Sequence, residues 1–160
     1  MHKFLQMLAV GLVFVLGATA TASAAAAADP VIGTWTINLE KSKFHDNRAP
    51  KSSVRTYSAG ANGTDMKVTG VAADGSAIAQ TATLTYDGKD CAETGSSEFD
   101  TLSIKKINGS TVKAELKKAG KVVGTTTRTL SGGGKVLTLS TSMKTAKGGT
   151  THDVAVYDKQ

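Results

Sequence analysis

Paired turn residues interrupt this chain at short intervals, and they constrain its fold more than any other feature. Seven such dipeptides occur: Asn62-Gly63, Asp74-Gly75, Asp87-Gly88, Asn108-Gly109, Ala119-Gly120, Gly132-Gly133 and Gly148-Gly149. Most follow the one before by 11 to 16 residues, and one follows by 21. Gly, Asn and Asp tolerate the positive φ angles of tight hairpin turns. Turns at this spacing predict an all-β barrel or sandwich.

Segments rich in Val, Thr, Ile, Leu and Tyr lie between these turns and have the length of strands. Nine of them predict strands: 31–39, 53–58, 65–72, 76–86, 101–107, 111–118, 122–130, 136–143 and 151–157. The clearest is 111–118, where Val112, Ala114 and Leu116 alternate with charged residues. Residues 40–50 and 87–98 break the alternation and therefore predict two long loops.

A meander of nine strands has two exposed edges unless it closes on itself. Closure into a barrel removes both edges, and about eight strands enclose an interior for side chains or one small ligand. We therefore expect residues 31–160 to form a single antiparallel up-and-down β-barrel of eight or nine strands. A two-sheet sandwich is the main rival.

The N-terminal residues have the pattern of an export signal. Lys3 precedes an apolar run at 7–16, and Ala22-Ser23-Ala24 is a small-residue cleavage site. The apolar run is shorter than the roughly 20 residues that a membrane-spanning helix needs. We expect residues 1–24 to be a signal peptide and 25–30 a flexible segment. The mature protein is then periplasmic or secreted, with no stable insertion in the membrane.

Six lysines gather on one or two adjacent predicted hairpins, and two interpretations of them stay open. They are Lys105, Lys106, Lys113, Lys117, Lys118 and Lys121, in a chain of net charge +6. The cluster is either a patch for an anionic surface or partner, or a solvated face whose charges discourage pairing between sheet edges. No aromatic residue is interleaved with the lysines, so nucleic acid is not an expected partner.

Residues that could carry chemistry are few. His45 and His152 are the histidines of the predicted mature chain, and neither stands in a metal-ligand motif. Cys91 is the single cysteine, so no intramolecular disulfide is possible. We interpret Cys91 as a small, partly buried side chain, and its role stays open. We expect a monomer that is not an enzyme and has no metal or cofactor.

The first predicted strand contains Gly33-Thr34-Trp35. Gly-x-Trp at this place resembles the lipocalin and calycin barrels, in which the tryptophan plugs the closed end and a basic side chain from a late strand packs over it. The resemblance implies that Trp35 is such a plug. It implies Arg128 as the basic partner, because Arg128 is the only arginine in the last four predicted strands.

Longer motifs resemble a group of small exported bacterial β-proteins described as lipocalin-like. They are the 29–35 segment, Glu40-Lys41-Ser42-Lys43-Phe44, Tyr86-Asp87-Gly88-Lys89 and Val154-Ala155-Val156-Tyr157. This resemblance spans almost the whole predicted mature chain. It implies a fold and a compartment, but no activity and no catalytic residues.

Strand alternation places a mixed set of side chains inside the expected barrel. An apolar cavity with a few polar groups is the usual form of a small-molecule site. We expect a small hydrophobic or amphiphilic ligand. Arg128 either meets a ligand carboxylate, as in the related fatty-acid carriers, or only caps Trp35. The predicted ligand-binding residues are Trp35, Gln80, Thr126, Arg128 and His152.

The predicted signal peptide can be tested by exporting the full chain from a bacterial host and measuring the intact mass of the product. Cleavage after Ala24 leaves 136 residues and lowers the net charge to +5, because Lys3 is the one charged residue removed. Cleavage after Ala20 or Ala22 would give a slightly larger mass. Replacing Ala20, Ala22 and Ala24 by Tyr should keep the precursor uncut, and an uncut wild-type chain would contradict the prediction.

Overall fold

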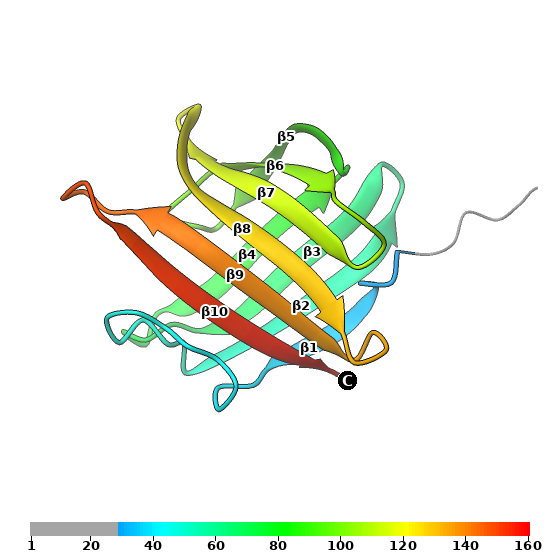
Figure 1. Ribbon diagram of the computed structural model, residues 1–160, viewed down its shortest axis with the longest axis horizontal. Coiled ribbons are helices and arrows are strands. Elements are labelled where there is room, and N and C mark those ends of the chain that lie inside the picture. Colours follow the sequence, from blue (N-terminus) through cyan, green and yellow to red (C-terminus); the bar gives the residue numbers. More distant parts are fainter. Residues whose placement is uncertain (1–28) are drawn as a thin grey trace, which may run out of the picture.

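The computed structural model describes residues 29–160, so the predicted signal peptide and most of the 25–30 segment lie outside the described residues. This part of the chain is all-β (Figure 1). Its ten strands are β1 (Gly33–Ile37), β2 (Ser52–Gly60), β3 (Gly63–Val71), β4 (Ala77–Leu84), β5 (Asp87–Thr94), β6 (Thr101–Lys106), β7 (Thr111–Lys118), β8 (Lys121–Ser131), β9 (Val136–Lys144) and β10 (Thr150–Lys159).

Each strand pairs antiparallel with its neighbours in sequence, and β1 pairs with β10, so the sheet is a closed barrel. Three residue pairs join β1 to β10: Trp35 with Lys159, Thr36 with Asp158, and Ile37 with Tyr157. The seam continues past β1, where the Asn38 N–H donates to the Val156 carbonyl at 2.7 Å. The expected barrel is confirmed, and the sandwich is excluded.

Trp35 lies at the end of the barrel where the described chain begins. The indole is fully buried, and its Nε1 donates to the Val31 carbonyl at 2.8 Å. The Lys159 ammonium lies 5.0 Å from the centre of the indole. The expectation that Arg128 packs over Trp35 is wrong. The strands that pair with β1 are β10 and β2, which place Lys159 and Arg55 directly across from Trp35, and the ammonium over the indole is that of Lys159.

Residues 87–98 were expected to form a loop, but most of them form β5. The barrel therefore has ten strands instead of eight or nine. Cys91 and Glu93 are buried on β5, whereas Ala92 and Thr94 are exposed. Low hydrophobicity and a bulge between Asp87 and Asp90 hide this alternation in the sequence. Asp87-Gly88 thus lies inside a strand, and the other six dipeptides lie at hairpin connections.

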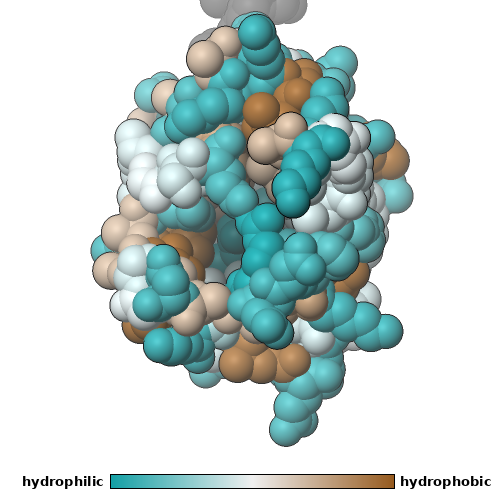
Figure 2. Space-filling model, turned by 90° about the vertical axis from the view of Figure 1, so that its left-hand side faces the viewer, coloured by the Kyte–Doolittle hydropathy of each residue, from teal (hydrophilic) through white to brown (hydrophobic). Residues whose placement is uncertain are grey.

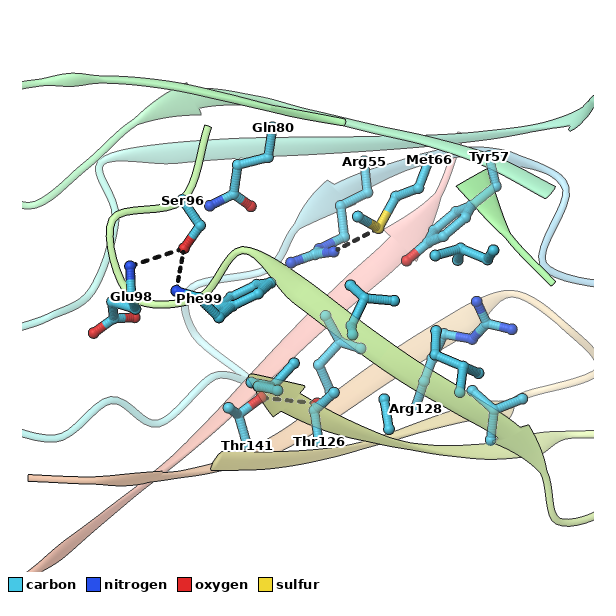
Figure 3. A pocket seen from close by; sticks show the side chains of 17 residues that line it. Arg55, Tyr57, Met66, Gln80, Ser96, Glu98, Phe99, Thr126, Arg128 and Thr141 are labelled. Atoms are coloured by element: carbon cyan, nitrogen blue, oxygen red, sulfur yellow. Dashed lines mark hydrogen bonds between the residues drawn. The ribbon is translucent and has the colours of Figure 1, made fainter. Parts of the chain in front are cut away.

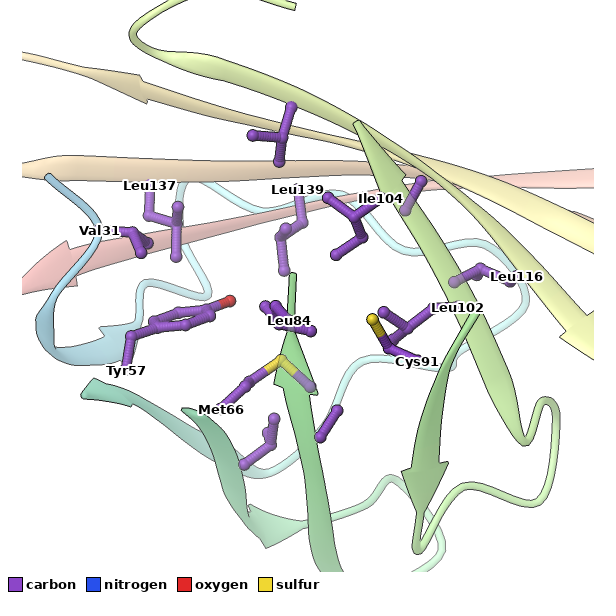
Figure 4. Close-up of a cluster of buried hydrophobic side chains, with 14 of the residues drawn as sticks. Val31, Tyr57, Met66, Leu84, Cys91, Leu102, Ile104, Leu116, Leu137 and Leu139 are labelled. Atoms are coloured by element: carbon purple, nitrogen blue, oxygen red, sulfur yellow. The ribbon is translucent and has the colours of Figure 1, made fainter. Parts of the chain in front are cut away.

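Side chains from all around the barrel meet in one hydrophobic core (Figure 4). The fully buried members with the largest volumes are Trp35, Leu84, Leu137, Val31 and Val68. Cys91 is 6% exposed and belongs to this core. Among residues 29–160, no helix has the length and apolar character needed to cross a membrane.

The weakest seam of the barrel lies between β4 and β5. Only Thr81 with Thr94 and Ala82 with Glu93 pair across it, whereas β3 and β4 share eight residue pairs. The loop 95–100 follows β5 directly and lies at the end of the barrel opposite the C-terminus (Figure 1). The position of this loop therefore depends on few backbone hydrogen bonds.

Gly95 fixes the start of that loop and gives a test of the fold. Gly95 and Gly133 both have positive φ angles, of 97° and 66°, but only at Gly95 would an added methyl group clash with a backbone oxygen, that of Ala79. We expect Gly95→Ala to lower the free energy of unfolding by about 2 kcal/mol more than Gly133→Ala. Chemical denaturation measures both, and equal losses would contradict the placement of Gly95.

Candidate functional site

The barrel encloses a cavity of about 240 Å³. It extends to the end of the molecule that carries the 95–100 loop, because Ser96, Glu98 and Phe99 belong to its lining. Figure 2 looks at this end and shows a hollow surrounded mainly by hydrophilic atoms. Deeper in, apolar side chains from β4, β6, β7 and β9 form most of the wall; they include Leu84, Leu102, Ile104, Val112, Leu116 and Leu139.

The structure places three of the five predicted ligand-binding residues in the wall of this cavity: Gln80, Thr126 and Arg128. Trp35 is part of the core but not of the cavity wall. The interior position expected for His152 is wrong. His152 is exposed on the outer face of β10, where its ring lies 2.9 Å from the Ser142 hydroxyl. The inner face of β10 at this level belongs to its buried neighbour Thr151.

Arg128 is a buried cation, with 6% of its surface exposed. Its Nη2 donates to the Tyr86 hydroxyl at 3.0 Å, and its guanidinium lies 5.3 Å from the ring centres of both Tyr57 and Tyr86. Within residues 29–160, no ion pair involves Arg128. Aromatic rings offset only part of the cost of burying a charge. Arg128 therefore presents an unneutralised charge to the cavity.

Arg55 is a second cavity arginine, which the sequence analysis missed. It lies on β2 and faces β8 and β9 across the cavity (Figure 3). Its guanidinium is 5.4 Å from the Tyr157 ring centre, and its Nη1 contacts the Met66 sulfur at 3.6 Å. Burial acts to lower the pKa of Arg55, but its interactions with the Tyr157 and Tyr57 hydroxyls together raise this pKa by more than burial lowers it. The guanidinium therefore stays charged.

The signal for Arg55 was present in the alternation of β2. Ser53 and Tyr57 are buried on this strand, and Arg55 lies midway between them on the same face. The buried hydroxyls of Ser53 and Tyr157 lie 3.1 Å apart. Assigning an inward face to the predicted strand 53–58 would have shown a second arginine inside the barrel.

Polar groups also gather near the mouth of the cavity. The Ser96 hydroxyl accepts hydrogen bonds from the backbone N–H groups of Glu98 and Phe99, at 3.1 and 3.4 Å (Figure 3). Glu98 forms an ion pair with Arg48 of the loop between β1 and β2. The cavity therefore has a polar mouth, an apolar middle and cationic groups inside.

Of three comparisons with known proteins, the one with solved structures found a similar fold. No family model matches the chain, and no curated protein matches it. A solved structure of zebrafish ileal bile acid-binding protein complexed with cholic acid is similar, with a TM-score of 0.52 and 14% identity. The match covers 82% of this chain and 99% of that chain. At this identity the likeness shows the fold alone, a closed antiparallel β-barrel.

The structure offers no metal centre within the described residues, because no three of their His, Cys, Asp and Glu side chains are grouped to hold an ion. Arginines, tyrosines and an apolar wall can bind and orient an acidic molecule. This arrangement is suited to binding.

The contact between Arg128 and Tyr86 can be tested by titration. Burial raises the pKa of Tyr86 to about 12, although Arg128 acts to lower it. NMR of ring-labelled tyrosine should show one phenol titrating near pH 12, and that signal should vanish in Tyr86→Phe. In Arg128→Met the pKa should rise further, because the phenolate loses its cation. A Tyr86 pKa near 10 would contradict this environment.

The raised pKa of Tyr86 also predicts how the free energy of unfolding depends on pH. The pKa of Tyr86 is higher in the folded than in the unfolded chain, so the folded chain binds the phenol proton more tightly. Between about pH 10 and pH 12, the free energy of unfolding should therefore fall with rising pH more steeply in the wild type than in Tyr86→Phe. Denaturation curves of both proteins across this range measure the difference. Equal slopes would contradict the shift.

Proposed function

We propose that this protein is an exported carrier that encloses a small acidic amphiphile in its barrel. The carboxylate of the ligand binds Arg128, and its apolar part lies against the leucine-rich middle of the cavity. The observation that carries this proposal is the buried guanidinium of Arg128, which faces an apolar cavity and has no acidic partner among the described residues.

Charge favours an acid over a neutral ligand. Arginine keeps its proton under all ordinary conditions, so its buried charge needs an anion or a dense set of acceptors. A carboxylate can accept two parallel hydrogen bonds from one guanidinium. Tyr86 uses one nitrogen of Arg128 and leaves the others for a ligand.

The cavity volume favours a small or flexible ligand. About 240 Å³ is slightly below the range of roughly 300–1,000 Å³ found for small-molecule sites. A medium-chain acid suits this space better than a bulky rigid molecule. The cholic acid bound by the zebrafish protein is also an acidic amphiphile, which supports the same class of ligand.

Compartment and activity are part of the proposal. Residues 1–24 direct a bacterial protein to the periplasm or the medium, and the mature chain acts as a monomer without catalysis, metal or cofactor.

The rival function uses the lysine-rich face. Lys105 lies directly across from Lys113 on the outer surface, but Lys117 is neutralised by Asp90 at 2.6 Å. The cavity arginines therefore favour the carrier.

Isothermal titration with two matched ligands tests the carrier. Decanoate and decanol have the same chain length, and only decanoate has a carboxylate. Decanoate should bind the wild type about tenfold to a hundredfold more tightly than decanol. In Arg128→Met this preference should disappear, while decanol binding is kept, because the apolar wall is unchanged.

The exposed Lys113→Met variant removes one positive charge from the outer face and is the matched control, with unchanged affinity for both ligands. Retained decanol binding by Arg128→Met shows that its barrel is folded. Absence of binding by both ligands to the wild type would contradict the carrier. Binding to an anionic polymer that weakens steeply with salt and is lost in Lys113→Met would favour the rival.

A further inference from the structure

The charged side chains in the wall of the cavity do not balance. Arg55, Glu98 and Arg128 are the charged residues of the lining. Glu98 forms its ion pair with Arg48 at the mouth, and within residues 29–160 no ion pair involves Arg55 or Arg128. Two positive charges therefore face one enclosed space without an anion, although a charge shielded from water is costly unless it is paired.

Different aromatic rings hold the two guanidinium groups. That of Arg128, on β8, lies 5.3 Å from the ring centres of Tyr57 and Tyr86. That of Arg55, on β2, lies 5.4 Å from the ring centre of Tyr157. Figure 3 shows the two side chains reaching into the cavity from these separate strands. The wall therefore provides two cationic positions rather than one.

Both guanidinium groups keep nitrogen atoms that a ligand can reach. Nη2 of Arg128 donates to the Tyr86 hydroxyl, and its Nε and Nη1 have no partner in the described part of the chain. On Arg55, Nη1 contacts the Met66 sulfur, and Nη2 has no partner among residues 29–160. These three nitrogens keep exposed surface, whereas Nε of Arg55 is sealed in the wall and is not available to a ligand. Each arginine can therefore donate to a carboxylate.

We infer that the cavity has two positions for an acidic group, one at Arg128 and one at Arg55, and that the ligand is a dicarboxylic acid. This inference rests on the proposed function and narrows its ligand. One carboxylate binds Arg128, the second binds Arg55, and the chain that joins them lies against the apolar part of the wall. A monocarboxylic acid would leave one of the two positive charges unpaired.

The two positions differ in burial, which gives them an order. Arg128 is 6% exposed, whereas Arg55 is half-buried. Attraction between opposite charges is stronger where less water screens it. A single carboxylate therefore prefers Arg128, and Arg55 takes the second acidic group of the same ligand.

Isothermal titration of the wild type with decanoate, decanedioate and monomethyl decanedioate tests the second position. Decanedioate should bind at least about tenfold more tightly than decanoate, because its second carboxylate forms charge-assisted hydrogen bonds with Arg55. Monomethyl decanedioate has two oxygens at the same end of the chain but no second charge. It should bind no more tightly than decanoate.

Variants of Arg55 show whether this residue causes the gain. Arg55→Met should abolish the gain and keep decanoate binding, which also shows that its barrel is folded. Arg55→Lys keeps the positive charge and should retain part of the gain. Lys67→Met is the matched control and should keep the full gain. Lys67 is exposed on β3 opposite Thr56, the residue after Arg55, so its loss removes one positive charge from the outer face nearby.

The two proposals fail in different ways. If none of these acids binds, the carrier function itself is wrong. If decanoate binds but decanedioate gains nothing, or the gain survives in Arg55→Met, the carrier stands and the second acidic position is overturned. Titration with hexanedioate, octanedioate and dodecanedioate adds a measurement that needs no variant. Affinity should peak at one chain length, because both arginines are fixed in the wall, and a steady rise with length would also overturn the second position.

Discussion

The pairing of β1 with β10 determines whether this chain has an interior at all. Only three residue pairs form that seam, and Trp35 belongs to one of them. The buried indole packs in the core and fixes Val31 by a hydrogen bond, while the Lys159 ammonium lies over its ring. Truncation of a buried tryptophan typically costs about 3–5 kcal/mol. Without this closure, the edges of β1 and β10 would be exposed, and both cavity arginines would be hydrated.

Because the barrel is closed, the charges of its two cavity arginines are shielded from water. Exposed pairs such as Lys41 with Asp158 contribute little to stability, because water screens them. Arg128 has no such screening and no acidic partner within residues 29–160. An apolar residue of similar volume would stabilise the barrel more. A buried arginine that weakens the fold is understandable if it contributes to binding as we propose, and its tyrosine neighbours Tyr57 and Tyr86 hold it in position.

Strand alternation predicted the face of most of the candidate residues, but not their height in the barrel. Gln80, Thr126 and Arg128 were placed inside correctly, because the face depends only on the local period of two. The predicted contact of Arg128 with Trp35 was wrong, because the height of a residue is set by register with strands that are distant in sequence.

β5 was missed because Asp87, Asp90 and Glu93 make it polar. Arg55 was missed because strand 53–58 was given no inward face, and His152 was assigned to the wrong face.

The two arginines lie at different depths, which gives the cavity a direction. β2 runs from the loop at the mouth toward the closed end, so Arg55 precedes Tyr57 along the path inward, and Tyr57 is the residue on which Arg128 stacks. An acid that enters head first therefore meets Arg55 before Arg128. A carboxylate crossing an apolar wall alone would lose its hydration with nothing in return. In the proposed carrier, Arg55 would provide a counter-charge on that path, which would make a deep position for the acid group reachable as well as stable.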